Sequence, residues 1–378
     1  MSPDRILYVV NDAPFFLSHR LPVARAAHQA GWEVHVATPP SDAAAVITAN
    51  GFSFHPISMT RKGTNPPAEL RSIASLFRLY RRVRPRLVHH VTMKPVLYGG
   101  IAARLARVPG VVGALTGLGH VFTADTAGSA VLRSLMKSGL RAALSHPNQM
   151  IILQNPDDRS MLIASNIIAP EETTLIPGSG VDMEVFHPSA EPAGPVLVVL
   201  PSRMLWSKGI AEFVDAARML RDAGSSARFA LVGDTDPDNP AAVPTARLAD
   251  WHGSGVVEWW GYQRDMPAVF RQAHVVCLPS FYGEGVPKSL IEAAASGKPI
   301  VSTNAPGCRE IVRDGENGLL VPIRDSRALA DALETLIDSE DLRRRMGARS
   351  RDIAVTGFAV ERIIAQTLAV YERLLTRI

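Results

Sequence analysis

Hydrophobic residues along the chain follow two alternating patterns. Short, nearly unbroken apolar runs, such as RILYVV and MIILQN, are followed by segments in which apolar residues recur every three or four positions. The first pattern is typical of buried parallel strands and the second of amphipathic helices. Gly31 stands where a C′ glycine would end the first helix. The alternation predicts successive βαβ units and therefore an α/β fold built on parallel sheets.

The alternation breaks at HPSAEPAGP and restarts with PVLVVLPS. A chain of 378 residues is about twice the usual length of one domain. We therefore predict two Rossmann-like domains, 1–187 and 196–357, joined by a linker at 188–195. A last amphipathic helix within 358–378 is expected, and it could pack across both domains. Ligands of such sheets sit beyond the carboxyl ends of the strands, so two sheets facing each other would form a cleft.

Composition excludes several classes of protein. The chain is 47% hydrophobic and 20% charged, as in an ordinary globular protein. The longest uncharged run, Val108–Ala124, is shorter than the roughly 20 apolar residues that span a bilayer. The N-terminal MSPDRILYVV lacks the pattern of a signal peptide, so we expect a cytoplasmic protein. Cys277 and Cys308 lie in unrelated contexts, which argues against a disulfide framework or a cysteine zinc site.

Positive charge is concentrated in the first half of the chain. Residues 1–180 hold 18 Lys and Arg against 10 Asp and Glu, whereas the remainder holds 22 against 26. The densest cluster, Arg78–Arg86, lies on a predicted amphipathic helix on which Leu70, Ile73, Phe77 and Tyr80 form the apolar stripe. This helix is either a solvated helix packed on a sheet or a surface for anionic lipid or a lipid-linked diphosphate. Nucleic acid is not expected, because no aromatic platform accompanies the arginines.

Two glutamates eight residues apart stand out in FYGEGVPKSLIEAAASGKP. Pro287 suits the first turn of a helix and Gly297 its C′ position, so a helix is predicted over about 287–296. Glu284 would then precede the helix and Glu292 lie on it. Eight helical residues span about 12 Å, more than the roughly 5–9.5 Å that separate glycosidase carboxylates. The pair therefore fits two parts of one extended ligand, with Glu292 on a ribose diol, a phosphate at the helix N-terminus and Glu284 on hydroxyls beyond it.

A pair of cations follows another predicted strand. Arg203 and Lys208, in SRMLWSKGI, come after PVLVVLP and precede a helix. Two cations in such a loop can neutralise a diphosphate leaving group, with arginine as a fork and lysine as a point charge. Solvated loop residues are the alternative for this pair on its own.

These segments resemble a known family. SRMLWSKG, WWGYQRDMP, EGVPKSLIEAAASGKPIV, PGCREIV and GENGLLV, in that order, look like the second domain of GT4 retaining, nucleotide-sugar-dependent glycosyltransferases, which have the GT-B fold. NDAPFFLSHRLPVARAAHQAGWEVHVAT, VHHVTMKP and GSGVDMEVF resemble the matching first-domain segments. The resemblance is nearest to bacterial enzymes that build polyprenyl-diphosphate-linked oligosaccharides, capsule or lipopolysaccharide.

The resemblance implies a catalytic role for several positions. Glu284 would contact the donor sugar and Glu292 the ribose. Arg203 and Lys208 would stabilise the donor diphosphate. His120, in GLGHVF, would touch the transferred sugar, and a structural loop histidine is the alternative for it.

The resemblance also implies the rest of the donor site. Backbone amides at the start of the helix, at Lys288 and Ser289, would bind the phosphates. The base would rest near the WGYQRD segment, at Gly261, Tyr262 and Arg264.

One departure from the family concerns the acceptor side. Many relatives carry a Gly-Gly loop after the first strand, but here the residues are 12–14, Asp-Ala-Pro. Ser18, His19 and Arg20 are the alternative candidates for acceptor binding, weighed against helix capping and packing.

The expected reaction moves a sugar from a nucleoside diphosphate, UDP first among candidates, to a lipid-linked acceptor with retention of anomeric configuration. No metal or cofactor is expected. Asp234 and Asp236, in GDTDPD, are interpreted as a turn rather than a metal site. A nucleotide-sugar epimerase or hydrolase of the same fold and a non-enzymatic peripheral membrane scaffold are the alternatives. The expected place of work is the cytoplasmic face of an anionic inner membrane.

Overall fold

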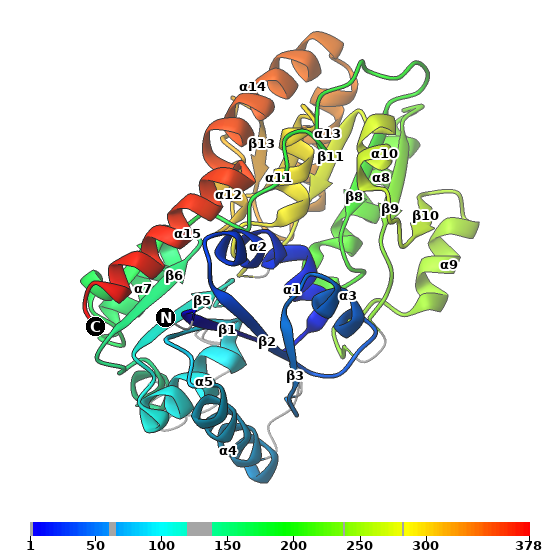
Figure 1. Ribbon diagram of the computed structural model, residues 1–378. Coiled ribbons are helices and arrows are strands. Elements are labelled where there is room, and N and C mark those ends of the chain that lie inside the picture. The colour runs from blue at the N-terminus through cyan, green and yellow to red at the C-terminus, as the bar shows by residue number, and fades with distance from the viewer. Residues whose placement is uncertain (1–2, 60–65, 119–137, 237–238, 282) are drawn as a thin grey trace. The chain divides into compact units, whose positions relative to one another are not determined.

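The chain forms two compact α/β units (Figure 1). The computed structural model describes residues 3–59, 66–118, 138–236, 239–281 and 283–378. The first unit holds the chain up to Ser179 together with 360–378, and the second unit holds 180–359.

The first unit is built on a parallel sheet, in which seven strands are described in the order β3-β2-β1-β4-β5-β6-β7. Its strands are β1 (Arg5–Val10), β2 (Glu33–Thr38), β3 (Ser53–Pro56), β4 (Leu87–Val91), β5 (Gly110–Leu115), β6 (Gln149–Leu153) and β7 (Thr173–Leu175). Its helices include α1 (Ala13–His19), α2 (Leu21–Gln29), α3 (Ala43–Ala49), α4 (Pro66–Val83), α5 (Met93–Ala106), α7 (Pro156–Ala164) and α15 (Val360–Leu375).

Strand β1 shows why the apolar runs are unbroken. Alternate residues of a strand point to opposite faces of the sheet. Ile6 and Tyr8 pack in a core with α1, α2 and α15, whereas Leu7 and Val9 pack in a second core with α4 and α5. Because helices cover both faces, every position of the strand interior is apolar.

The second unit is built on a parallel sheet, in which six strands are described in the order β10-β9-β8-β11-β12-β13. Its strands are β8 (Leu197–Pro201), β9 (Arg228–Val232), β10 (Glu258–Gly261), β11 (Val275–Leu278), β12 (Ile300–Thr303) and β13 (Gly318–Val321). Its helices include α8 (Ile210–Asp222), α9 (Thr245–Gly253), α10 (Met266–Gln272), α11 (Lys288–Ala295), α12 (Cys308–Ile311), α13 (Ser326–Ile337) and α14 (Glu340–Phe358). The prediction of two parallel α/β sheets is confirmed.

Each sheet has one point at which the direction of strand addition reverses. In the second unit, β8 to β10 extend to one side of β8 and β11 to β13 to the other, so β8 and β11 are neighbours. In the first unit, β1 and β4 stand in the same relation. Ligands of open parallel sheets bind at the carboxyl ends of strands at such a switch point. The loops after β8 and β11 are therefore the place to look for a site in the second unit.

The segments predicted as a linker and as a last helix each belong to one unit. In the predicted linker, Glu191 forms an ion pair with Arg343 of α14, and the carbonyl of Pro192 lies 3.0 Å from His274 Nε2. Helix α15 returns to the first unit and packs on α2, β5 and β6. There the hydroxyl of Tyr371 hydrogen-bonds Tyr8 at 3.1 Å.

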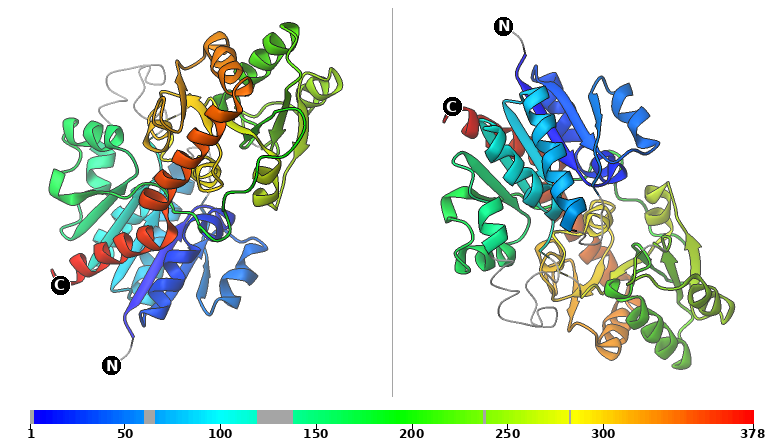
Figure 2. Two further views of the ribbon diagram at one scale, coloured as in Figure 1. Left: turned by 90° about the horizontal axis from the view of Figure 1, so that it is seen from above. Right: turned by 90° about the horizontal axis from the view of Figure 1, so that it is seen from below.

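The basic amphipathic helix is present as α4 and packs along α5. Leu76, Leu79 and Tyr80 are buried on its inner face, whereas Leu70 of the predicted apolar stripe is exposed. None of the helices within the described part of the chain is long and apolar enough to cross a bilayer. Figure 2 shows α4 and the other helices from above and below.

Candidate active site

The loops that follow β8 and β11 are joined to each other at the switch point of the second sheet. The carbonyl of Ser207 accepts a hydrogen bond from the backbone N–H of Phe281 at 3.1 Å. The hydroxyl oxygen of Ser280 lies 3.2 Å from the same carbonyl oxygen. These bonds bring together the two motifs that the sequence analysis selected, whose residues Lys208 and Glu284 are 76 positions apart in the chain.

Two glycines allow other loops to approach the loop after β11 closely: Gly209 from the loop after β8 and Gly307 from the loop after β12. Gly209 follows the first motif at φ +75°, and a Cβ there would lie 2.2 Å from the carbonyl oxygen of Pro279. Gly307 has φ +83°, and a Cβ there would overlap the carbonyl oxygen of Gly285. Both positions require a left-handed backbone and leave no room for a side chain, so glycine is needed for steric as well as conformational reasons.

Lys208 and Glu284 form an ion pair at the centre of the joined loops. Lys208 Nζ lies 2.5 Å from Glu284 Oε1, and each side chain is 14% exposed. Ser280 Oγ donates to the same carboxylate oxygen at 2.7 Å. The prediction gave the two residues different partners on one ligand, and the structure adds a direct bond between them. Charge-assisted hydrogen bonds of this kind hold a carboxylate in one orientation.

Arg203 lies in the same loop but has a different partner. Its Nη1 is 3.2 Å from Asp236 Oδ2, and the arginine side chain is 51% exposed. Asp236 therefore forms an ion pair with Arg203 in the loop after β8. The interpretation of Asp236 as a turn residue did not include this role. Asp234 Oδ1 accepts a hydrogen bond from the backbone N–H of Thr235 at 2.9 Å. In the described part of the chain no three His, Cys, Asp or Glu side chains are grouped as a metal site.

Helix α11 carries the second glutamate. It begins at Lys288 after Pro287, and Gly297 with φ +67° stands just beyond its end, which confirms the predicted helix. Glu292 Oε1 lies 3.4 Å from Lys288 Nζ, one turn earlier. Burial raises the pKa of Glu292, and the nearby charge of Lys288 offsets part of that shift. The first turn of α11 is a site where backbone N–H groups and the helix dipole favour a phosphate.

Of the three residues predicted to hold a base, Gly261 ends the edge strand β10, and Tyr262 and Arg264 lie just after it. Gly261 has φ +65°, and its carbonyl accepts from the N–H of Gly233 at 2.8 Å. Tyr262 is 70% exposed, and Arg264 is also exposed. Strand β9 separates β10 from β8, so these residues are on the same side of the switch point as Arg203.

The predicted acceptor residues of the first unit divide into exposed and buried positions. Ser18 is exposed and donates to the carbonyl of Pro14 at 2.9 Å, and His19 stacks on Phe15 with ring centroids 3.9 Å apart. Arg20 is 4% exposed, and burial lowers its pKa. Ser18 thus bonds within its own helix, His19 packs on a ring and Arg20 is enclosed, whereas acceptor binding stays a prediction. His120 lies outside the described residues.

Sequence reasoning missed two polar groups of the site. Ser280 is the last residue of HVVCLPS, two positions after β11, and Asp236 follows β9 by four positions. Their place just after buried strands is the signal that would have identified them. Burial, helped by the negative charge of Glu284, raises the pKa of the Cys308 thiol to about 12 and keeps it protonated.

The architecture has counterparts among solved structures. A glycosyltransferase from Rickettsia africae ESF-5 matches with a TM-score of 0.80 and 16% identity over 99% of both chains. Alr3699/HepE of Anabaena in complex with UDP matches with a TM-score of 0.77 and 20% identity, covering 98% of this chain and all of the other. The fold is therefore the GT-B fold of glycosyltransferases.

Sequence comparisons then identify the family. The model for glycosyl transferase 4-like proteins matches residues 5–155, and the model for glycosyl transferases group 1 matches residues 195–339. A relative from Campylobacter jejuni, N,N'-diacetylbacillosaminyl-diphospho-undecaprenol alpha-1,3-N-acetylgalactosaminyltransferase, is 25% identical over 96% of this chain and 99% of its own. The chain belongs to the GT4 family of glycosyltransferases.

Proposed function

We propose that the protein transfers a sugar from a nucleoside diphosphate to a lipid-linked saccharide during assembly of a bacterial surface glycan, with retention of anomeric configuration. The observation that carries this proposal is the Lys208–Glu284 ion pair, held by Ser280 at the switch point and next in sequence to α11. The Campylobacter relative acts on an undecaprenol-diphosphate acceptor, and the Anabaena protein was solved with UDP. UDP is therefore the first nucleotide to test.

The donor would lie with its phosphates at the first turn of α11, where the backbone amides of Lys288 and Ser289 would bind them. The helix dipole places partial positive charge at this end. Glu292 stands one turn further along, and a carboxylate can accept hydrogen bonds from both hydroxyls of a ribose. The base would rest toward β10, near Gly261, Tyr262 and Arg264.

Catalysis would depend on charge that develops on the leaving group. As the bond from the anomeric carbon to the phosphate oxygen breaks, that oxygen becomes more negative and Lys208 neutralises it. The departing oxygen then takes the proton of the acceptor hydroxyl, which attacks from the same face. Glu284, oriented by Lys208 and Ser280, holds hydroxyls of the donor sugar. Arg203 adds positive charge at the diphosphate, so the proposed reaction needs no metal or cofactor.

We further propose that the first unit works at the cytoplasmic face of an anionic inner membrane. Helix α4 exposes Arg78, Arg81 and Arg82, and Arg84 follows it, also exposed. Each basic side chain near an anionic leaflet contributes roughly 1 kcal/mol of attraction. Exposed Leu70 on the same helix adds an apolar contact at the surface. A lipid-linked acceptor would meet the enzyme there.

Calorimetric titration of UDP and GDP, without added metal, tests the donor site. We expect one nucleotide to bind the wild type and Glu292→Ala to lose that binding, because the ribose contact is gone. Glu316→Ala is the matched control, since Glu316 is half exposed, pairs with Arg349 and lies at the amino end of β13. Absence of binding by every nucleotide would refute the donor site and favour a membrane scaffold, which would bind anionic vesicles alone.

Product analysis separates transfer from the other enzymatic possibility. An epimerase or hydrolase of this fold would convert the nucleotide sugar without an acceptor. A transferase incubated with donor alone leaves it largely intact and consumes it when a polyprenyl-diphosphate saccharide is added.

A further inference from the structure

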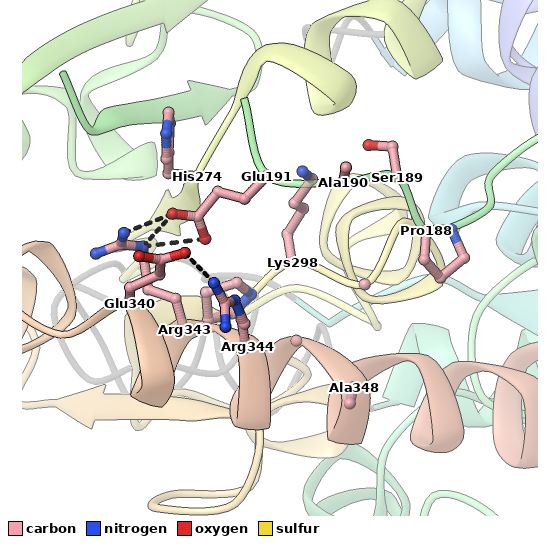
Figure 3. Close-up of a pocket in the computed structure, with 13 residues that line it drawn as sticks. Pro188, Ser189, Ala190, Glu191, His274, Lys298, Glu340, Arg343, Arg344 and Ala348 are labelled. Atoms are coloured by element: carbon pink, nitrogen blue, oxygen red, sulfur yellow. Dashed lines mark hydrogen bonds and ion pairs between the residues drawn. The ribbon is translucent and has the colours of Figure 1, made fainter. Parts of the chain in front are cut away.

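A pocket of the second unit lies at the end of the sheet opposite to Glu284. It has a volume of about 480 Å³ and opens between the segment 188–191, the residues 297–299 and α14 (Figure 3). His274 directly precedes β11 and Pro299 directly precedes β12, so the pocket lies at the amino ends of these strands. The candidate active site lies beyond their carboxyl ends. The two are therefore separate places on one sheet.

Four of the charged side chains around this pocket already have partners. Arg343 Nη2 lies 2.5 Å from Glu191 Oε1, and its Nη1 donates to the carbonyls of Leu336 and Ile337 at 2.8 Å. Arg344 forms an ion pair with Glu340. Figure 3 shows both pairs as dashed lines. The two arginines and two glutamates thus cancel in pairs.

Both ring nitrogens of His274 also have hydrogen-bond partners. The backbone N–H of Leu197 donates to its Nδ1 at 3.0 Å, so the ring proton is on Nε2, which donates to the carbonyl of Pro192 at 3.0 Å. Burial lowers the pKa of this histidine, and it stays neutral at physiological pH. It lines the pocket but contributes no charge to it.

Lys298 is the charge that remains. Its side chain lines the pocket and is 4% exposed, yet it makes no hydrogen bond and no ion pair with any residue that the structure describes. Burial lowers its pKa and the charge of Glu191 opposes that shift, but the two are not paired. Most of the side chain is withdrawn from water, whereas the ammonium nitrogen keeps contact with solvent inside the pocket, so an anion can reach it there. The pocket therefore has one unbalanced positive charge.

We propose that this pocket binds the phosphate group of a small molecule, with the Lys298 ammonium as its counter-ion. The volume is within the range of small-molecule sites, about 300–1,000 Å³. Three ammonium hydrogens can meet phosphate oxygens, and the hydroxyl of Ser189 and the exposed guanidinium of Arg344 line the same pocket. The site is independent of the donor site and would regulate or localise the enzyme through a phosphorylated metabolite.

Inorganic phosphate is the probe, titrated into the full chain and followed by calorimetry at near-neutral pH. The wild type should bind it, and Lys298→Met should bind it at least about tenfold more weakly, because the charge-assisted contacts are lost. Lys298→Arg should retain binding, which shows that charge rather than shape is needed. Lys208→Met should leave this binding unchanged, since Lys208 belongs to the donor site.

Thermal unfolding checks that Lys298→Met is folded, and the retained phosphate binding of Lys298→Arg gives a second readout if it is not. Absence of phosphate binding to the wild type overturns the proposal, as does binding that Lys298→Met leaves intact. Binding that is lost in Lys208→Met alone assigns the phosphate to the donor site and also overturns it. UDP titration of Lys298→Met distinguishes failure of this proposal from failure of the proposed donor site, because the donor site is expected to remain intact in this variant.

Discussion

The two sheets have the same kind of switch point but place their polar side chains differently. In the second unit, Lys208 and Glu284 stand in loops after the strands and remain partly exposed. In the first unit, Arg20 is buried, and its positive charge acts on Tyr371 and on His89 within the unit. His89 Nδ1 lies 2.6 Å from the Tyr371 hydroxyl.

This difference separates two uses of buried polarity. Polar side chains in the loops at the carboxyl ends of the strands can exchange their protein partners for a ligand. Polar groups enclosed within a unit specify how its elements dock, because leaving them without partners costs free energy. We therefore expect changes in the second unit to affect turnover and those in the first unit to affect folding.

The largest expected effect is that of Lys208→Ala on turnover. Removing a cation that meets developing charge lowers kcat by about 10²–10³-fold, and acceptor affinity should change little. Steady-state kinetics with a lipid-linked acceptor measure both quantities. Arg218→Ala, in an exposed pair with Asp215 on α8, is the matched control. A normal kcat in Lys208→Ala would remove its proposed role.

An intermediate effect is expected for Tyr371→Phe, on stability alone. The change removes the hydroxyl that Tyr8 and His89 share, and leaving buried partners unsatisfied costs roughly 1–3 kcal/mol. Urea unfolding measures the loss, and UDP titration should give the wild-type affinity. If UDP affinity falls while stability is kept, the comparison between the units is wrong.

The smallest effect is that of Glu292→Gln on the pH dependence of stability. Burial raises the folded-state pKa of Glu292, so its contribution to stability is present at low pH and is lost as pH rises through that pKa. The glutamine variant does not titrate, so it should be more stable than the wild type at neutral pH. The gap should close as pH falls toward 4.5, the ordinary value. Unfolding across a pH series, with Glu316→Gln as control, checks this, and a constant gap would contradict it.

Local signals in the sequence predict part of this picture well. Pro287 and Gly297 bound α11 correctly, because both residues restrict the backbone at the positions where they stand. Strand order is not a local property, so the neighbourhood of β8 and β11 could not be predicted from hydrophobic periodicity. The bond between Lys208 and Glu284 depends on that neighbourhood, as does the contact of Arg203 with Asp236. The isolation of Lys298 depends on which side chains surround it.

Because α15 belongs to the first unit, the two units complete their cores in a fixed order during synthesis of the chain. Ile363, Val370, Tyr371 and Leu374 of this helix complete the core that β1 begins. A ribosome releases these residues only after the whole of 180–359 has emerged. The second unit can thus finish folding while the nascent first unit still exposes an apolar face. Chaperone dependence and sensitivity to loss of α15 should therefore be concentrated in the unit whose synthesis begins first.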